Sequence, residues 1–191
     1  MAESMLSGIL MGTAAAAVGT AGLNIATYLD MTIRGRPSSG VPAQTAGKIA
    51  AAAGVSLAPG ASGGQERQQQ IDNRRSGLGS LLGYVAGLGV GAAYGAIRPE
   101  LGNLPIPVTG LALACAVMAA GDLPAVLTGS TNPREWGLSG WLVDAVPHLA
   151  YGMLTAIAFE AFTAGPLGRR SVDSAEYLSA AMRHSSARLR R

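Results

Sequence analysis

Two aspartates and a histidine occur where an ionisable group is unusual and able to do chemistry. Asp122 and Asp144 are the only charged residues of two apolar stretches, residues 105–127 and 138–159, and His148 follows Asp144 by one helical turn. Two carboxyl groups in one partly buried site cannot both ionise easily, so the pair would keep a proton or bind a cation. A neighbouring imidazole can relay a proton. These residues therefore indicate a proton- or cation-binding site.

Further polar residues extend this candidate site. Tyr151 and Thr155 continue the stripe of Asp144 and His148 at helical spacing, and Asn24 and Asp30 lie near the end of the first apolar stretch. The candidate proton or ion site thus comprises Asp122, Asp144, His148, Tyr151, Asp30 and Asn24. Because two aspartates and one histidine are few ligands for a divalent ion, we expect no metal centre.

Two other interpretations of the aspartates stay open. Asp144 and His148 could hydrogen-bond each other and nearby backbone, and so only tie two helices together. Alternatively, Asp122 could cap a helix or pair with Arg34, Arg36 or Arg134.

The sequence carries no motif of an enzyme or a cofactor site. A P-loop, G-x-S-x-G, H-E-x-x-H and a dinucleotide fingerprint are all absent, and Gly87-x-Gly89-x-Gly91 follows no strand. The one cysteine, Cys115, excludes a disulfide framework and a cysteine-based zinc cluster. A net charge of +3 is too small and scattered to indicate nucleic-acid binding. We therefore expect a protein without catalysis and without a cofactor.

The elements that would position these residues are four long apolar stretches. Only 13% of the 191 residues are charged, against about 25% in average soluble domains. Residues 7–29 and 76–97 contain no charge at all. Crossing about 30 Å of hydrocarbon takes about 20 helical residues. The pattern predicts an all-α integral membrane four-helix bundle, with helices at about residues 7–29, 76–97, 105–127 and 138–162. A soluble Ala-rich bundle is the alternative, because Ala and Gly favour insertion weakly.

The remaining segments are predicted to be aqueous. Residues 30–75 form a long loop after the first helix, in which residues 42–55 could be a short interfacial helix and 65–75 could prolong the second membrane helix. Residues 164–191 hold six arginines and form a basic, helix-compatible tail that could bind anionic lipid. The chain is thus divided into a transmembrane domain, 7–163, and a surface tail, 164–191.

The second apolar stretch carries a glycine at every fourth position. Residues four apart share a helix face, so this face has no side chains and lets another backbone approach closely. The first stretch offers a matching face. The packing glycines are Gly79, Gly83, Gly87, Gly91 and Gly95, with Gly8 and Gly12 (and Ala16) opposite. The face could pack within the chain, form a homo-oligomer or a larger membrane complex, or line a pore or face lipid.

Four crossings place both termini on one side and the segments 30–75 and 128–137 on the other. Lys and Arg divide evenly, seven to each side. Arg34 and Arg36 follow the first helix closely, which favours a cytoplasmic location for the two segments.

Trp136 and Trp141 flank the start of the last helix and are expected to be membrane-interface anchors.

Several runs of sequence carry a resemblance. NIATYLDMTIRGRPSSGVPAQTAGKIA, the glycine series, GDLPAVLTG and DAVPHLAYG resemble small uncharacterised polytopic membrane proteins of actinobacteria, over most of residues 7–163. The first helix and its Pro-containing basic loop are more distantly similar to a bacterial inner-membrane family linked to acid resistance. The resemblance implies a multi-pass protein of a bacterial inner membrane. The similarity to the acid-resistance family adds slight support to a proton-handling function.

Two functions follow as expectations. The first is an accessory or structural membrane subunit that assembles through the glycine face, with lipid and a second copy or a larger complex as partners. The alternative is a small proton- or cation-linked transporter or channel that uses Asp122, Asp144 and His148.

Overall fold

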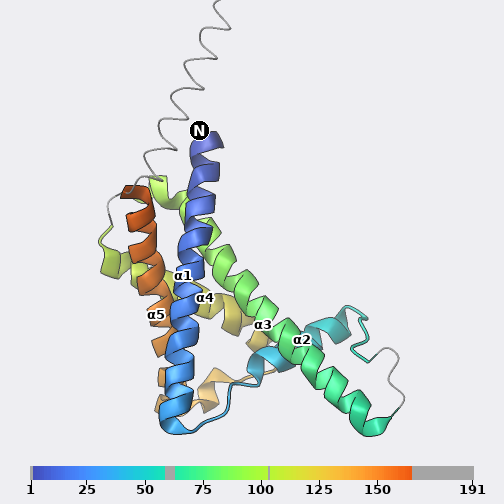
Figure 1. Ribbon diagram of the computed structural model, residues 1–191. Coiled ribbons are helices and arrows are strands. Elements are labelled where there is room, and N and C mark those ends of the chain that lie inside the picture. Colours follow the sequence, from blue (N-terminus) through green and yellow to red (C-terminus); the bar gives the residue numbers. More distant parts are fainter. Residues whose placement is uncertain (1, 59–62, 103, 165–191) are drawn as a thin grey trace, which may run out of the picture.

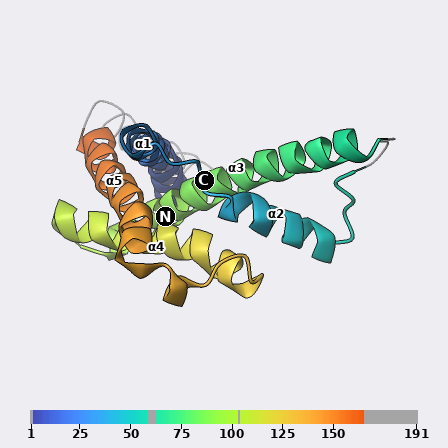
Figure 2. The same cartoon turned by 90° about the horizontal axis from the view of Figure 1, so that it is seen from below.

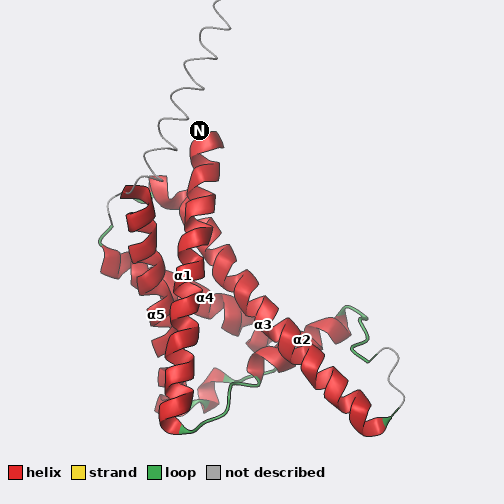
Figure 3. Cartoon of the chain, viewed as in Figure 1, coloured by secondary structure: helices red, strands yellow, loops and turns green. Residues whose placement is uncertain are grey.

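The computed structural model describes residues 2–58, 63–102 and 104–164. These residues form only helices and connecting segments, as predicted, and contain no strand (Figure 1, Figure 3). The α-helices are α1 (Ala2–Arg34), α2 (Val41–Ala52), α3 (Gly64–Ile97), α4 (Ile106–Leu127) and α5 (Gly137–Ala164), with short 3₁₀ helices at Arg98–Glu100 and Pro133–Glu135. The predicted tail lies outside the described residues beyond Ala164.

Four of these helices are long and apolar enough to cross a membrane. The candidate spans are Met5–Arg34, Gly64–Glu100, Ile106–Leu127 and Gly137–Ala164. Each predicted apolar stretch is therefore helical, as expected from its length. Passage through lipid itself stays a prediction.

The segment 30–75 contains more helix than the apolar pattern indicated. α1 continues five residues beyond position 29 and ends before Gly35, whose φ of +63° favours glycine. α3 begins at Gly64, so residues 65–75 prolong the second long helix as expected; most of them are good helix formers such as Gln, Glu and Arg.

The expected short helix is α2, and its end is well defined. Gly54, with φ +70°, follows the helix, and two backbone bonds close it: Val55 N donates to Ala50 O at 2.8 Å, and Gly54 N to Ala51 O at 3.0 Å. This is the hydrogen-bond pattern of a Schellman cap. The chain thereby turns back toward α3.

The long helices form an open, splayed bundle. α1 and α5 run along each other, and α3 packs against α1 and then inclines away from it, with α2 on its outer part (Figure 1, Figure 2). α4 packs mainly on α5 and crosses behind the others. The start of α1 lies at the same end of the molecule as the ends of α3 and α5, as the predicted topology requires.

Close backbone contact joins α1 to α3. Gly8 and Gly12 of α1 meet Gly91 and Gly95 of α3, and a Cβ atom placed on Gly91 would lie 2.5 Å from the Gly12 carbonyl oxygen. Any side chain here would push the two backbones apart. Glycine is therefore required at this crossing.

The rest of the glycine face is divided between other neighbours. A Cβ on Gly79 would lie 2.7 Å from the Pro42 carbonyl carbon of α2, and one on Gly87 would lie 2.8 Å from Thr20 Oγ1. Gly83 has nothing within 4 Å. The face thus packs mostly within the chain.

A small core lies where α1, α3 and α5 meet. Ala15, Ala16 and Tyr151 are fully buried, and the rings of Tyr94 and Phe159 pack edge to face with centroids 4.9 Å apart. Small residues let the helices approach, and the aromatic rings fill the remaining space. This core fixes the direction in which α5 presents its polar stripe.

Candidate functional site

Asp122 and Asp144 meet between α4 and α5. The two carboxyl groups are close enough for their negative charges to repel each other. α4 ends five residues after Asp122 and α5 begins seven residues before Asp144, so the antiparallel hairpin brings the two to similar depth. The structure therefore joins the two acidic residues that the sequence analysis paired.

His148 completes this carboxyl–imidazole cluster, formed by Asp122, Asp144 and His148. Its Nδ1 lies 2.7 Å from the backbone oxygen of Asp144 and 3.4 Å from Asp144 Oδ1. A carbonyl oxygen can only accept, so Nδ1 carries the hydrogen and donates it. In the neutral ring, Nε2 is then left as a proton acceptor.

One oxygen of the cluster is buried without a donor. Asp144 Oδ2 has no hydrogen-bond partner within the part of the chain that the structure describes. A buried carboxylate oxygen with no donor is costly. A proton placed between the two carboxyl groups would supply the missing hydrogen bond and remove one of two like charges.

Prolines beside both aspartates add acceptors. Pro124 lies inside α4 and Pro147 inside α5. Because proline has no N–H, the carbonyl oxygens of Ala120 and Val143 lose their usual helical donors. The surroundings of the cluster are therefore richer in acceptors than in donors, an arrangement that suits a proton or another cation.

Contacts from other elements close the end of α4 near the cluster. Lys48 Nζ of α2 donates to the carbonyl oxygens of Thr128, at 2.9 Å, and Gly129, at 2.7 Å. A cation at this position satisfies free carbonyls at a helix C-terminus. α2 is thereby fixed to the hairpin that carries both aspartates.

The start of α5 is held from two sides. Arg34 Nη2 of α1 donates to Ser139 Oγ at 3.1 Å. The rings of Trp136 and Trp141 pack with centroids 5.0 Å apart, and Trp136 Nε1 donates to Thr131 Oγ1 at 2.7 Å. The tryptophans thus pack on each other, and their role at a membrane interface stays a prediction.

Asp30 and Asn24 are not part of the cluster. Asp30 pairs with Arg36 and with Arg34, whose Nη1 lies 3.5 Å from Asp30 Oδ1. Asn24 is half-buried on α1, and within the described residues no hydrogen bond links it to the cluster. Arginines close to Asp30 in sequence neutralise it locally, and they are therefore not available to Asp122.

Tyr151 serves the core rather than the cluster. It is fully buried, and its hydroxyl donates to the backbone oxygen of Gly87 at 2.6 Å. Thr155, one turn further on, is also fully buried and lies against Gly19. The predicted stripe on α5 is therefore divided: its first two residues face Asp122 and its last two face α1 and α3.

Replacing Tyr151 by Phe is expected to lower stability and leave proton binding intact. The change removes one hydrogen bond, worth about 1 kcal/mol, and keeps the ring that fills the core. Unfolding in detergent, followed by far-ultraviolet circular dichroism, measures the change. Equal stability of variant and wild type would contradict the role assigned to this bond.

An ion pair that was not predicted from the sequence lies at the other end of α5. Arg98 Nη2 lies 2.8 Å from Glu160 Oε1, and the Arg98 side chain is only 18% exposed. Arg98 and Glu160 each follow directly after a long apolar stretch, and the predicted topology places both on the same side of the membrane. That shared position is the feature of the sequence that could have predicted the pair. The pair joins the end of α3 to α5 and so supports the frame around the cluster.

No three-ligand metal site appears in the described part of the chain: no group of three or more His, Cys, Asp or Glu side chains there is arranged to hold a metal ion. The chain matches no family model, no curated protein and no solved structure. The resemblance to actinobacterial membrane proteins therefore stays a prediction.

Proposed function

We propose that this chain is a multi-pass membrane protein that holds one proton between Asp122 and Asp144 and exchanges it through His148. The observation that carries the proposal is the meeting of the two carboxyl groups, with Asp144 Oδ2 buried and unpartnered within the described residues. Ionisable residues at membrane depth typically mark proton or ion pathways.

The outward faces of the long helices support the membrane part of the proposal. Leu10, Val85 and Leu123 are 62%, 68% and 59% exposed, and only 22–39% of each candidate span is buried within the chain. A water-soluble monomer rarely exposes apolar surface so continuously. Lipid would cover these faces without a further partner.

The cluster offers a short route for a proton. Because Nδ1 is the ring nitrogen that faces Asp144, a proton leaving the carboxyl pair would reach the free Nε2 of His148 through water. Its arrival would convert the imidazole to imidazolium and leave one carboxylate negative. That carboxylate and the imidazolium attract each other, which favours the charge-separated state. The His148 side chain is 19% exposed, so its ring is not sealed inside the chain.

Assembly through the glycine face receives less support. Gly79, Gly87, Gly91 and Gly95 already contact other parts of this chain, and Gly83 alone of the series is open. A role as an accessory subunit of a larger membrane complex stays a prediction that would need another surface.

Proton flux across vesicles tests the proposal. Vesicles that contain the wild-type protein should lose an imposed pH gradient faster than protein-free vesicles, as followed by an enclosed pH-sensitive dye. Asp144→Asn should reduce the protein-dependent rate about tenfold or more, because it removes a group that exchanges the proton.

Asp30→Asn is the matched control. It removes a carboxylate of the same type that is already paired with Arg34 and Arg36. Its flux should equal that of the wild type. If vesicles with the wild-type protein lose the pH gradient no faster than protein-free vesicles, the proposal of proton transport is wrong.

A further inference from the structure

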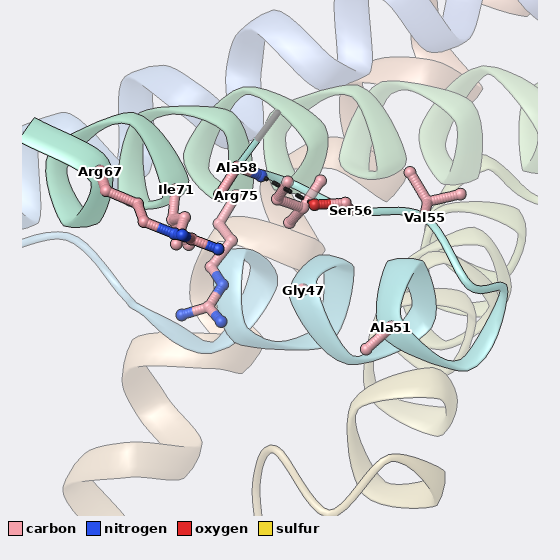
Figure 4. A pocket seen from close by; sticks show the side chains of 9 residues that line it. Gly47, Ala51, Val55, Ser56, Ala58, Arg67, Ile71 and Arg75 are labelled. Carbon is pink, nitrogen blue, oxygen red and sulfur yellow. Dashed lines mark hydrogen bonds between the residues drawn. The ribbon is translucent and has the colours of Figure 1, made fainter. Parts of the chain in front are cut away.

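A second polar feature lies away from the carboxyl–imidazole cluster, between α2 and α3. An open pocket of about 230 Å³ lies between α2, the segment that follows it and the first part of α3 (Figure 4). Arg67, Ile71 and Arg75 line it from α3, and Gly47, Val55 and Leu57 are among the residues opposite. Residues four apart share a helix face, so both arginines face the cavity.

The two arginines lack strong acidic partners. Arg75 has one distant pair, with Nη1 3.9 Å from Asp72 Oδ1, and its Nε is buried without a hydrogen-bond partner in the described residues. Arg67 makes no side-chain hydrogen bond or ion pair with any described residue. Two guanidinium groups on one cavity, without a strong counter-ion, form a site for an anion.

Two acidic residues, Glu66 and Asp72, lie on the same stretch of α3. Gln68 Nε2 lies 3.0 Å from Asp72 Oδ1 and 3.1 Å from Oδ2, and Gln70 Nε2 lies 3.5 Å from Glu66 Oε1. The glutamine amides are neutral, so both carboxylates keep their negative charge. Arg67, Arg74 and Arg75 outnumber them on this stretch, so the net charge beside the pocket stays positive.

The surrounding chain is shaped around Arg75. A Cβ atom on Gly47 would lie 2.7 Å from Arg75 Nε, so the arginine crosses α2 where that helix has no side chain. Arg74 Nη1 donates to Leu57 O at 2.7 Å and holds the segment after α2 against α3. Figure 4 shows the Arg75 guanidinium directed toward α2 and Arg67 extending over the same cavity.

We propose that this cavity binds the phosphate group of an anionic phospholipid through Arg67 and Arg75. Guanidinium groups bind phosphate oxygens in pairs, and Val55, Leu57 and Ile71 offer apolar surface to the glycerol and upper acyl carbons. The assignment of this phosphate group to a lipid depends on the membrane location proposed above. Phosphate recognition itself does not depend on the proton site.

Lipid retention by the purified full-length chain tests this inference. The protein in detergent is mixed with equal amounts of dioleoyl phosphatidylglycerol and dioleoyl phosphatidylcholine, and bound lipid is measured by native mass spectrometry. The wild type should retain phosphatidylglycerol selectively. Arg67→Gln with Arg75→Gln should weaken that retention about thirtyfold, and each single change about fivefold.

Arg134→Gln is the charge-matched control, because Arg134 is exposed and does not line the cavity. It should retain lipid as the wild type does. Circular dichroism checks that each variant keeps its helices, and the single changes remain informative if the double one unfolds.

Inorganic phosphate separates the two sources of the anion. If the headgroup phosphate is recognised, millimolar phosphate alone should compete weakly and phosphatidylglycerol should stay bound. Stabilisation by phosphate with no lipid selectivity would overturn the lipid assignment and make the site one for soluble anions. Equal lipid retention by the wild type and the double variant would overturn the site altogether, whatever the flux assay shows.

Discussion

Gly91→Ala is expected to lower stability by about 3 kcal/mol, although it adds a single methyl group. The new Cβ would lie 2.5 Å from the Gly12 carbonyl oxygen and would also meet the Cβ of Ala16. Backbone atoms and a fully buried Ala16 cannot yield without separating α1 from α3. Overpacking of this kind typically costs about 1–3 kcal/mol.

Gly83→Ala is the control within the same helix and the same glycine series. A Cβ there has nothing within 4 Å, so the substitution should be neutral or stabilising by up to about 1 kcal/mol, since Ala favours helix over Gly. Denaturant titration in detergent, followed by circular dichroism, compares the two variants. Equal loss at both positions would contradict the α1–α3 contact.

The second large effect, a loss of proton flux, is expected when either residue of the Asp122–Asp144 pair is replaced. Asp122→Asn and Asp144→Asn should each remove most of the protein-dependent proton flux, and the double variant should be no slower than either single one. Two groups that share one proton act as a unit, so their effects do not add. The vesicle assay measures all three rates.

The double variant decides whether the pair is one site. If the losses multiply, the two aspartates act independently and the shared-proton arrangement is wrong. The asparagine side chains are close in size to the carboxyls they replace, so the α4–α5 contact should persist. Circular dichroism of each variant checks this.

Local sequence features predicted much of the fold and the core of the site. The length of each apolar stretch predicted a helix, and the spacing of Gly8 and Gly12 against Gly91 and Gly95 anticipated residues that meet at the α1–α3 contact. The distances of Asp122 and Asp144 from their connecting segment placed them at equal depth. Each of these inferences needs only helical geometry.

Other features depend on how helices cross, which spacing alone does not give. Tyr151 shares a stripe with Asp144, but over seven residues, or about 10 Å, the neighbouring helix changes from α4 to α3. Lys48 caps α4 only because α2 packs beside α4 in the folded chain. Asp30 was assigned to the candidate proton site because of its expected depth in the membrane. Its ion-pair partners are instead the cations nearest to it in sequence, Arg34 and Arg36.

The central claim is that Asp122 and Asp144 hold one proton between them, and infrared spectroscopy tests it most directly. Protein labelled with ¹³C-aspartate and embedded in lipid at neutral pH should show the carbonyl stretch of a protonated carboxyl group. This band should disappear in Asp144→Asn and persist in Asp30→Asn. A wild-type spectrum that contains only ionised aspartate would contradict the account.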